Sequence, residues 1–379
     1  MRIVVAPDSF KESLDARAVC EAVASGLARG WPGVEVISVP LADGGEGTVR
    51  AMVAATGGTC VTAAVSDPLG RPVAAEFGIL GDGATAVIEM AAASGLALLT
   101  PEERNPLVTT TFGTGELIRA ALDRKVRRII LGIGGSATVD GGVGAAQALG
   151  AAFLNAERAP IGPGGGALNA LESISLDGLD RRLKSVKVEA ACDVDNPLTG
   201  PTGSAAVYGP QKGATPEMVE QLEGNLVHLA NVVERTLDVA IAMTPGAGAA
   251  GGLGAGLLAF LGATLRPGID LVMDAVNFAE VIRGADLIIT GEGRVDGQSV
   301  FGKVLSGVAR VAAPQGIPVI ALAGTLGQGW RDVLDAGITA CFAIADGPIA
   351  LSDAIDRAPD LLANTAEQLA RTLKASGGY

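Results

Sequence analysis

Short apolar runs alternate with segments of helical periodicity along most of this chain. The apolar runs predict strands at 3–6, 34–39, 128–133, 186–191, 286–290, 317–321 and 338–344, the first of them buried. The periodic segments predict helices at 15–28, 46–55, 116–123, 216–237, 303–313, 330–336 and 352–374. Such alternation is typical of α/β proteins built on a mostly parallel sheet.

The middle of the chain departs from this rhythm. The runs around 73–77 and 84–89 are short and separated by turns, which favours antiparallel or mixed strands. From residue 285 the opening rhythm returns. We therefore predict a discontinuous Rossmann-like domain with a mostly parallel sheet and, inserted in it, a second α/β domain with a mixed sheet. The predicted bounds are 1–66 and 285–379 for the first domain and 67–284 for the second.

Composition and charge exclude several classes of protein. The chain has 379 residues and a formal net charge of −13, so a sequence-independent nucleic-acid binder, which needs a basic surface, is not expected. The basic cluster at 124–128 leads straight into an apolar run and is interpreted as a solvated helix end. The four cysteines form no closely spaced pair, which excludes a CxxC motif and fits buried thiols in a reducing cytosol.

One uncharged segment, 245–265, has the length of a membrane span. Its many glycines weaken its hydrophobicity, so it is interpreted as a glycine-rich loop that runs into a buried helix. The N-terminal residues 1–6 are interpreted as a first strand rather than a signal peptide. We therefore expect a cytoplasmic protein with no membrane partner.

Strings of small and acidic residues stand where predicted strands end. They occupy 8–11, 43–47, 134–142, 193–196 and 291–297. Ligands of open α/β proteins bind beyond the carboxyl ends of strands. Glycine lets the backbone approach a ligand and present N–H groups to anions, while carboxylates suit Mg²⁺ or proton transfer. Together these features point to phosphoryl transfer.

The first two strings each allow two interpretations. Ser9 and Lys11 could hold a carboxylate or phosphate at a helix start, or the string could be ordinary capping by Asp8. Asp43 and Glu46 could reach a metal or a substrate hydroxyl, or they could flank a tight turn before a helix.

Two glycine strings resemble nucleotide motifs imperfectly. Gly132, Gly134 and Ala137 match the spacing of a dinucleotide loop, but no acidic residue follows at the end of a later strand, so anion binding is favoured. The string from 297 to 303 nearly matches a Walker A loop, with Val304 where Ser or Thr should ligate Mg²⁺. Lys303 could still meet phosphates at the start of its helix.

The string after the 186–191 strand contains two carboxylates. In extended backbone, Asp193 and Asp195 point the same way and would repel each other unless a metal, a cation or a shared proton compensates. Lys212 is a candidate for that cation, and solvated turn acids are the alternative. The single histidine, His228, lies inside the 216–237 helix, so a Ser-His-Asp triad is not expected.

Taken in order, the strings resemble the bacterial glycerate kinase family of the GarK type. They read APDSFKESL, PLADGGEGT, DPLGR, GIGGSATVDGG, CDVDNPL, YGPQKGA, GAGAAGGLG and DLIITGEGRVDGQ, and they span essentially the whole chain. The one departure is Glu12, where a small residue such as Gly is expected. The resemblance implies ATP-dependent phosphorylation of D-glycerate with Mg²⁺, giving 2-phosphoglycerate rather than 3-phosphoglycerate. It also implies a cleft between the two α/β domains.

Roles for individual residues follow from the chemistry of that reaction. Asp193 is expected to orient or deprotonate the hydroxyl, together with Lys11 and Asp195. Substrate binding is expected from Ser9, Asp8, Arg71, Asp43 and Glu46. Phosphate groups are expected at Gly134, Gly135, Ser136, Lys212, Gly291 and Lys303. Mg²⁺ is expected at Asp195, Glu292 and Asp296.

Rival functions remain open at this point. A NAD-dependent dehydrogenase of a hydroxy acid would explain the dinucleotide-like spacing, and a kinase of another small hydroxy acid would use the same groups. A non-catalytic protein that binds glycerate or nucleotide is a further alternative, but it would not need so many carboxylates around an anion. The expected partners are D-glycerate and ATP, with a homodimer as one option.

Overall fold

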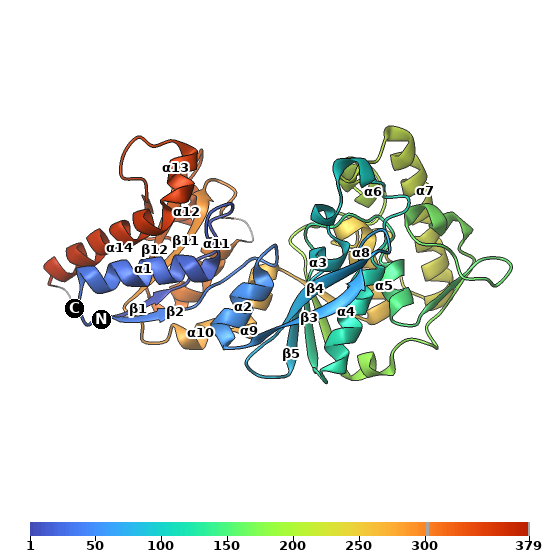
Figure 1. Ribbon diagram of the computed structural model, residues 1–379, viewed down its shortest axis with the longest axis horizontal. Helices are drawn as coiled ribbons and strands as arrows, with labels where there is room; N and C mark the ends of the chain where they lie inside the picture. Colours follow the sequence, from blue (N-terminus) through green and yellow to red (C-terminus); the bar gives the residue numbers. More distant parts are fainter. Residues whose placement is uncertain (301–302, 378–379) are drawn as a thin grey trace. The chain divides into compact units, whose positions relative to one another are not determined.

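The computed structural model describes residues 1–300 and 303–377 (Figure 1), so Gly302 of the string that resembles a Walker A loop lies outside the described residues. The chain divides into two compact units. Unit 1 consists of Met1–Asp43, Arg50–Gly58 and Ile269–Tyr379, and unit 2 of Gly44–Val49 and Thr59–Gly268.

Unit 1 is built on a parallel sheet to which both ends of the chain contribute. Within the described residues its strand order is β13-β12-β11-β1-β2, and every neighbouring pair is parallel. Register pairs such as Ile3 with Leu287 join the first strand to the C-terminal segment. The strands are β1 (Arg2–Val5), β2 (Glu35–Ser38), β11 (Leu287–Val295), β12 (Val319–Leu326) and β13 (Ala340–Ala343). The predicted parallel sheet is thereby confirmed.

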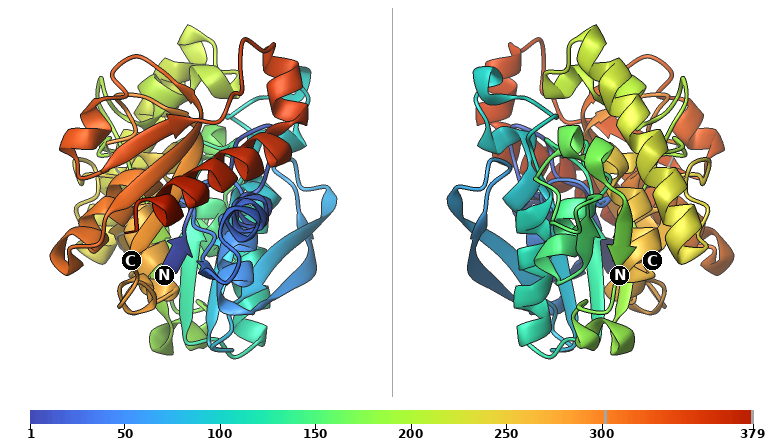
Figure 2. Two further views of the ribbon diagram at one scale, coloured as in Figure 1. Left: turned by 90° about the vertical axis from the view of Figure 1, so that its left-hand side faces the viewer. Right: turned by 90° about the vertical axis from the view of Figure 1, so that its right-hand side faces the viewer.

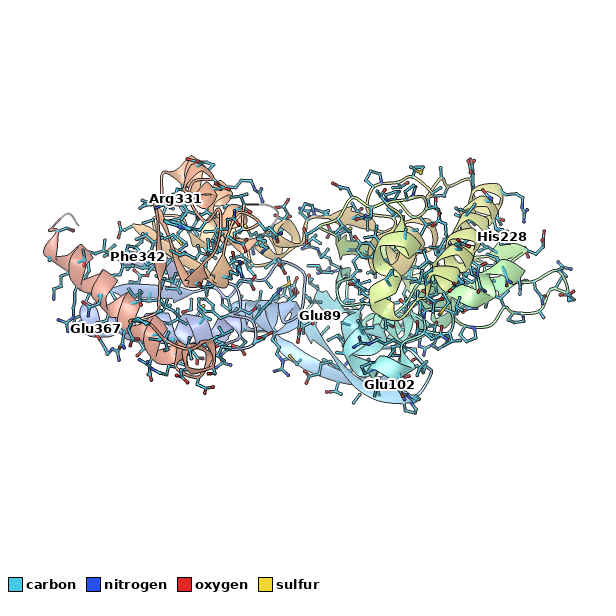
Figure 3. The ribbon with its side chains drawn as sticks, turned by 90° about the horizontal axis from the view of Figure 1, so that it is seen from above. Glu89, Glu102, His228, Arg331, Phe342 and Glu367 are labelled. Carbon is cyan, nitrogen blue, oxygen red and sulfur yellow. The ribbon has the colours of Figure 1, made fainter. Side chains whose placement is uncertain are left out.

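Two long helices of unit 1, α1 (Ala16–Gly30) and α14 (Ala358–Ala375), pack side by side (Figures 1 and 2). The packing depends on glycine, because a Cβ on Gly26 would lie 2.0 Å from the Ala363 carbonyl oxygen. Asp15 caps α1 by accepting a hydrogen bond from the Ala18 N–H at 2.8 Å. Glu367, labelled on α14 in Figure 3, pairs with Arg29 of α1 at 3.0 Å. Shorter helices complete the unit: α2 (Thr48–Thr56, whose first residues belong to unit 2), α9 (Gly268–Ala275, whose first residue belongs to unit 2), α10 (Phe278–Val281), α11 (Val304–Ala312), α12 (Asp332–Asp335) and α13 (Leu351–Asp356).

Unit 2, all of whose residues are described, contains a mixed six-stranded sheet in the order β10-β9-β6-β5-β4-β3. The pairs from β5 to β10 are parallel, and β3, β4 and β5 are antiparallel to one another in turn, as the middle segment predicted. The strands are β3 (Thr59–Ser66), β4 (Pro72–Ile79), β5 (Thr85–Glu89), β6 (Arg128–Gly132), β9 (Lys187–Ala191) and β10 (Thr264–Arg266). A separate ribbon pairs β7 (Ala152–Leu154) with β8 (Ser173–Ser175).

The uncharged segment 245–265 contains a buried helix of unit 2, as predicted, and ends in the first residues of strand β10. Helix α8 (Ala249–Leu261) begins with a left-handed kink at Ala250, Gly251 and Gly252. The kink needs glycine, since a Cβ on Gly251 would lie 1.7 Å from the Thr138 carbonyl oxygen. In the described residues, no helix has the length and apolarity needed to span a membrane. Unit 2 also contains α3 (Ala91–Ser94), α4 (Phe112–Asp123), α5 (Val143–Ala148), α6 (Ser204–Tyr208) and α7 (Pro216–Leu237).

Several boundaries differ from the predicted ones. Residues 59–66, predicted in the terminal domain, form the edge strand β3 of the unit 2 sheet, while 269–284 belong to unit 1. The last predicted helix is divided at Arg357 into α13 and α14.

A buried carboxylate joins three strands of unit 2. Glu189 on β9 accepts hydrogen bonds from Arg128 Nε at 2.7 Å, Lys187 Nζ at 2.8 Å and Arg266 Nη1 at 3.1 Å. Burial raises the pKa of Glu189, but the hydrogen bonds from Lys187, Arg128 and Arg266 outweigh it and lower the pKa to about 2. Arg128, the last residue of the basic cluster, is therefore paired with the buried Glu189.

Glu189→Gln is expected to destabilise the protein by about 3 kcal/mol at pH 7, because it leaves three cations without their carboxylate. The unfolded pKa is 4.5 and the folded pKa is about 2, so the wild-type advantage is present above pH 4.5 and is lost as pH falls through 2. Urea unfolding at pH 7, 5 and 3 measures the difference. Equal free energies of unfolding at pH 7 would show that the cluster contributes nothing.

Candidate active site

The turn Gly134–Ser136 follows strand β6 at its carboxyl end and presents unpaired backbone amides. Gly134 and Gly135 are exposed, and Gly135 has φ +74°, a conformation that favours glycine. The Leu96 N–H fixes the turn by donating to the Gly135 carbonyl at 2.9 Å. Across the described residues, the N–H groups of Gly134, Gly135 and Ser136 have no acceptor. Successive unpaired N–H groups of this kind form an anion-binding concavity.

A buried cation stands next to this turn. Lys212 is only 2% exposed, and its ammonium donates to Ser136 Oγ at 2.6 Å and to the Thr138 carbonyl at 2.7 Å. Burial lowers the pKa of Lys212 to about 7, and the Asp140 carboxylate opposes that shift. An ammonium has three hydrogens, and the third finds no acceptor among the described residues. The turn and Lys212 together suit a phosphate group.

Asp140 is a further residue of this region, which the sequence reasoning did not single out. It is 1% exposed, and its carboxylate binds the Thr110–Thr111 loop and the start of helix α5. The available clue was an acid enclosed by glycines at the end of the 134–142 string. Its importance follows only from the contacts that the fold provides.

The 43–47 string is divided between the units. Gly44 belongs to unit 2, where a Cβ on Gly132 would lie 2.6 Å from the Gly44 carbonyl oxygen. This segment therefore reaches the end of strand β6, just before the anion-binding turn. Glu46 is exposed, and Asp43 belongs to unit 1.

In unit 1, three carboxylates influence one another at the ends of neighbouring strands. Asp8, just after β1, and Glu292, within β11, are 9% and 8% exposed. Burial, followed by the charges of Asp43 and Glu292, raises the pKa of Asp8 to about 7, although the Ser9 N–H donates to its Oδ1 at 2.6 Å. Burial also raises the pKa of Glu292, which accepts a hydrogen bond from the Ser299 hydroxyl. The cluster therefore favours a cation or a proton.

Two lysines act on these carboxylates. The charge of Lys11, an exposed residue, lowers the pKa of Asp8, and the charge of Lys303 lowers the pKa of Glu292.

Two positions of these strings have backbone reasons for their residues. Glu12 has φ +65°, so the position where glycine was expected does have a backbone conformation that favours glycine. Gly291 is required by packing, because a Cβ there would lie 2.2 Å from the Leu322 carbonyl oxygen. That contact explains the glycine without a phosphate.

Other predicted residues lie in different surroundings. Asp193 and Asp195 are both exposed, which agrees with the alternative of solvated turn acids; Asp193 Oδ1 accepts from the Gly268 N–H at 3.0 Å. Lys212 binds Ser136 and Thr138, so its predicted pairing with these aspartates is wrong.

Two further residues of the predicted set have protein partners of their own. Arg71 donates to Asp67 and Glu103, each at 2.6 Å, which compensates its charge within unit 2. His228 lies on α7, as Figure 3 shows, and its Nε2 lies 2.6 Å from the Leu171 carbonyl. The histidine ring is thus hydrogen-bonded to the backbone within unit 2.

The carboxylates of unit 1 are the candidate protein ligands for Mg²⁺. In the part of the chain that the structure describes, no group of three or more His, Cys, Asp or Glu side chains is arranged to hold a metal ion. Asp296 is engaged by Arg294 Nε at 3.1 Å and by the Gln298 N–H at 2.9 Å. Mg²⁺ in kinases, however, takes one or two carboxylates together with substrate phosphates. The carboxylates of Asp43 and Glu292, which act on each other electrostatically, fit that number of protein ligands.

Unit 2 presents an amide-lined turn with a buried lysine, and unit 1 presents an acidic cluster, each at the carboxyl end of strands. Such groups in such places are typical of open α/β enzymes that bind phosphorylated ligands. The chain belongs to the glycerate kinase family: the sequence model of that family matches residues 3–374. The chain is 53% identical over 374 residues to the glycerate kinase of Bacillus subtilis (strain 168), covering 99% of this chain and 98% of that protein. It is 51% identical over 373 residues to the glycerate 2-kinase of Escherichia coli (strain K12), covering 98% of each chain.

A solved structure supports the same relationship at the level of the fold. The crystal structure of a protein described as a "putative glycerate kinase 2" from Salmonella typhimurium LT2 superimposes with a TM-score of 0.92 at 49% identity, covering 100% of both chains. The predicted family, the α/β fold class and the kinase activity are thus confirmed.

Proposed function

We propose that this protein transfers the γ-phosphoryl group of ATP to the 2-hydroxyl of D-glycerate, giving 2-phosphoglycerate and ADP. The observation that carries the proposal is the Gly134–Ser136 turn, whose unpaired amides stand beside the buried ammonium of Lys212. The name of the Escherichia coli relative, glycerate 2-kinase, supports the 2-position. Family membership supports glycerate as the acceptor and ATP as the donor.

The turn and Lys212 are proposed to bind the transferring phosphoryl group. During transfer, negative charge spreads over the phosphoryl oxygens, and catalysis consists mainly of positioning and neutralising that charge. Backbone N–H groups fixed by the β6 turn can do so without reorganisation. The third hydrogen of the Lys212 ammonium supplies a further donor, with the full charge behind it.

Asp8 is proposed as the group that accepts the proton of the 2-hydroxyl. A general base works best when its pKa is close to the working pH, and burial, the largest cause, raises the pKa of Asp8 well above its ordinary value. Its Oδ1 already accepts from the Ser9 N–H, so Oδ2 takes the proton. The glycerate oxygen attacks the γ-phosphorus, the bond to the β,γ-bridging oxygen breaks, and ADP leaves. Asp193, the base expected from the sequence, stays a prediction with weaker support because it is exposed.

Lys11 and Ser9 are proposed to bind the glycerate carboxylate. Lys11 is close enough to Asp8 to lower its pKa, which places a cation beside the proposed base. Asp43 and Glu292 are the residues that would hold Mg²⁺, and the ion would neutralise charge on the ATP phosphates. We propose a mostly oxygen-bound ion with protein ligands from unit 1 alone.

The reaction is tested by ADP release with D-glycerate, L-glycerate and other small hydroxy acids, with phosphorus NMR of the product. The expected result is ADP release specific to D-glycerate and a phosphorus doublet, because 2-phosphoglycerate has one proton on the carbon that bears the phosphate. A triplet would show 3-phosphoglycerate and overturn the proposed position. Nicotinamide reduction without ADP release would overturn the kinase proposal altogether.

A further inference from the structure

Asp140 is the most densely hydrogen-bonded carboxylate described in unit 2. Its Oδ2 accepts from the Thr111 N–H at 2.8 Å, the Thr111 hydroxyl at 2.9 Å, the Thr110 hydroxyl at 3.2 Å and the Gly144 N–H at 3.3 Å. Its Oδ1 accepts from the Gly142 N–H at 3.1 Å. These contacts tie the 110–111 loop to the start of helix α5 through one buried side chain.

The hydrogen-bond directions show which form of Asp140 the site stabilises. The Thr111 hydroxyl oxygen accepts from the Ala145 N–H at 2.9 Å, and the Thr110 hydroxyl oxygen accepts from the Phe112 N–H at 3.2 Å. Both hydroxyls therefore direct their own protons to Asp140, and every other partner is an N–H. Burial raises the pKa of Asp140 above its ordinary value. Because every one of these contacts donates to Asp140, the network stabilises the carboxylate against the effect of burial.

Two observations connect Asp140 to the proposed phosphate site. Lys212 donates to Ser136 Oγ and to the Thr138 carbonyl, so the ammonium is held by the same segment of backbone that ends at Asp140. Asp140 is also the charged side chain that opposes the effect of burial on Lys212. The backbone of Arg104 lies against the neighbouring Gly213, where a Cβ would be 2.3 Å from the Arg104 carbonyl oxygen. An ammonium this deeply buried costs several kcal/mol unless a carboxylate compensates it.

A buried hydroxyl in the same segment also lacks a protein partner. Thr138 is fully buried, and its Oγ1 has no hydrogen-bond partner within the described chain, whereas its carbonyl binds Lys212. The kink of α8 fixes this stretch, since the Gly141 N–H donates to the Gly251 carbonyl at 3.1 Å. The backbone between Ser136 and Asp140 is therefore rigidly held, and displacing Asp140 would displace the atoms that hold Lys212.

We propose that Asp140 is a positioning residue for phosphate binding: it anchors the 136–142 segment and keeps Lys212 charged, and it acts on the ligand only through Lys212. The inference rests on the proposed function, because it assumes that Lys212 and the turn bind the phosphates of ATP. Beyond that function, the buried charge of Asp140 does not contact the ligand, but the charge of Lys212 depends on it.

The test is a double-mutant cycle with Asp140→Asn and Lys212→Met, read by ATP binding in calorimetry and by glycerate-dependent ADP release. Because Asp140 acts on the ligand only through Lys212, Asp140→Asn should weaken ATP binding about 30-fold when Lys212 is present. In the Lys212→Met background the same substitution should weaken ATP binding less than threefold. The pH above which ATP binding weakens should also move at least one unit lower in Asp140→Asn, a change that a merely structural role would not produce. Equal losses in both backgrounds, or an unmoved pH profile, would overturn the proposal.

Glu189→Gln is the matched control, since it also removes a buried carboxylate from unit 2 but at the strand starts near Arg128. It should lower stability and leave ATP affinity within twofold. If Asp140→Asn shows no cooperative unfolding transition, Thr111→Val takes its place in the cycle, with the same criterion for coupling, because it removes two hydroxyl contacts to Asp140. If the wild type phosphorylates glycerate normally but the effects of the two substitutions on ATP binding are additive, this inference alone is refuted. If the wild type does not phosphorylate glycerate, the proposed function is refuted.

Discussion

Lys212→Met is expected to lower kcat for glycerate phosphorylation by about 10³-fold or more, the order found when a charged stabiliser of phosphoryl transfer is removed. The same change should leave the free energy of unfolding equal or higher, because methionine fills the space of the lysine without a buried charge. The folded pKa of Lys212 is about 7, below its ordinary value of 10.5. The unfolded chain therefore binds more protons between these values, so wild-type stability rises with pH across that window, and the variant should lose this slope.

Steady-state kinetics and urea unfolding between pH 6 and 10 measure both effects. Lys184→Met is the matched control, since Lys184 is an exposed lysine of the same unit and should tolerate the change within twofold in kcat. A Lys212→Met enzyme with more than a tenth of wild-type kcat would exclude Lys212 from phosphoryl stabilisation. Loss of folding in Lys212→Met would instead mean that the ammonium is structural.

Asp8→Asn is expected to reduce kcat by about 10²- to 10⁴-fold and to remove the acidic limb near pH 7 from the profile of kcat/KM. Asparagine keeps an acceptor for the Ser9 N–H, so the local hydrogen bond survives. The folded pKa of about 7 lies above the ordinary 3.8, so the stability associated with Asp8 is fully present below pH 3.8 and is lost as pH rises through 7. The variant should be more stable than the wild type at pH 8, by up to about 4 kcal/mol.

The sign of that stability difference separates a functional carboxylate from a structural one. Asp15→Asn is the control, because Asp15 caps α1 and asparagine caps helices equally well, so activity and stability should change little. Activity and urea unfolding are measured from pH 4 to 8 for both variants. An Asp8→Asn enzyme that keeps the limb near pH 7 at wild-type rate would remove Asp8 from the proton transfer.

Local patterns were enough to predict the elements whose burial repeats with a fixed period. The amphipathic helix α7 begins at Pro216 and ends at Leu237, as predicted, because its apolar stripe and the capping Thr215 act within a few residues. Strands β11 and β12 of the parallel sheet begin with continuous apolar runs for a similar reason: both faces of these residues are covered. Strand β3 was missed because its exposed and partly buried positions provide no such run.

The candidate site was predictable only in part. The sequence alone placed the Gly134–Ser136 turn after a strand, because glycine is the residue that permits φ +74° at Gly135 and the apolar run of β6 fixes where the strand ends. It also determined that acids gather where strands end. The sequence could not predict that Asp193 is exposed, because the burial of a loop depends on which other segments pack against it.

Only the tertiary structure decided which charged side chains are buried and which groups they contact. Lys212 follows a short helix and resembles a surface residue in sequence, yet folding brings its ammonium to 2.6 Å from Ser136, 76 positions earlier. Asp8, Asp43 and Glu292 likewise interact because β1 and β11 pair across the length of the chain. The sequence determines the strands, the turns and the kinds of side chain available. The pKa values and partners that give those side chains their chemistry arise from desolvation and long-range contacts, which exist only once the chain has folded.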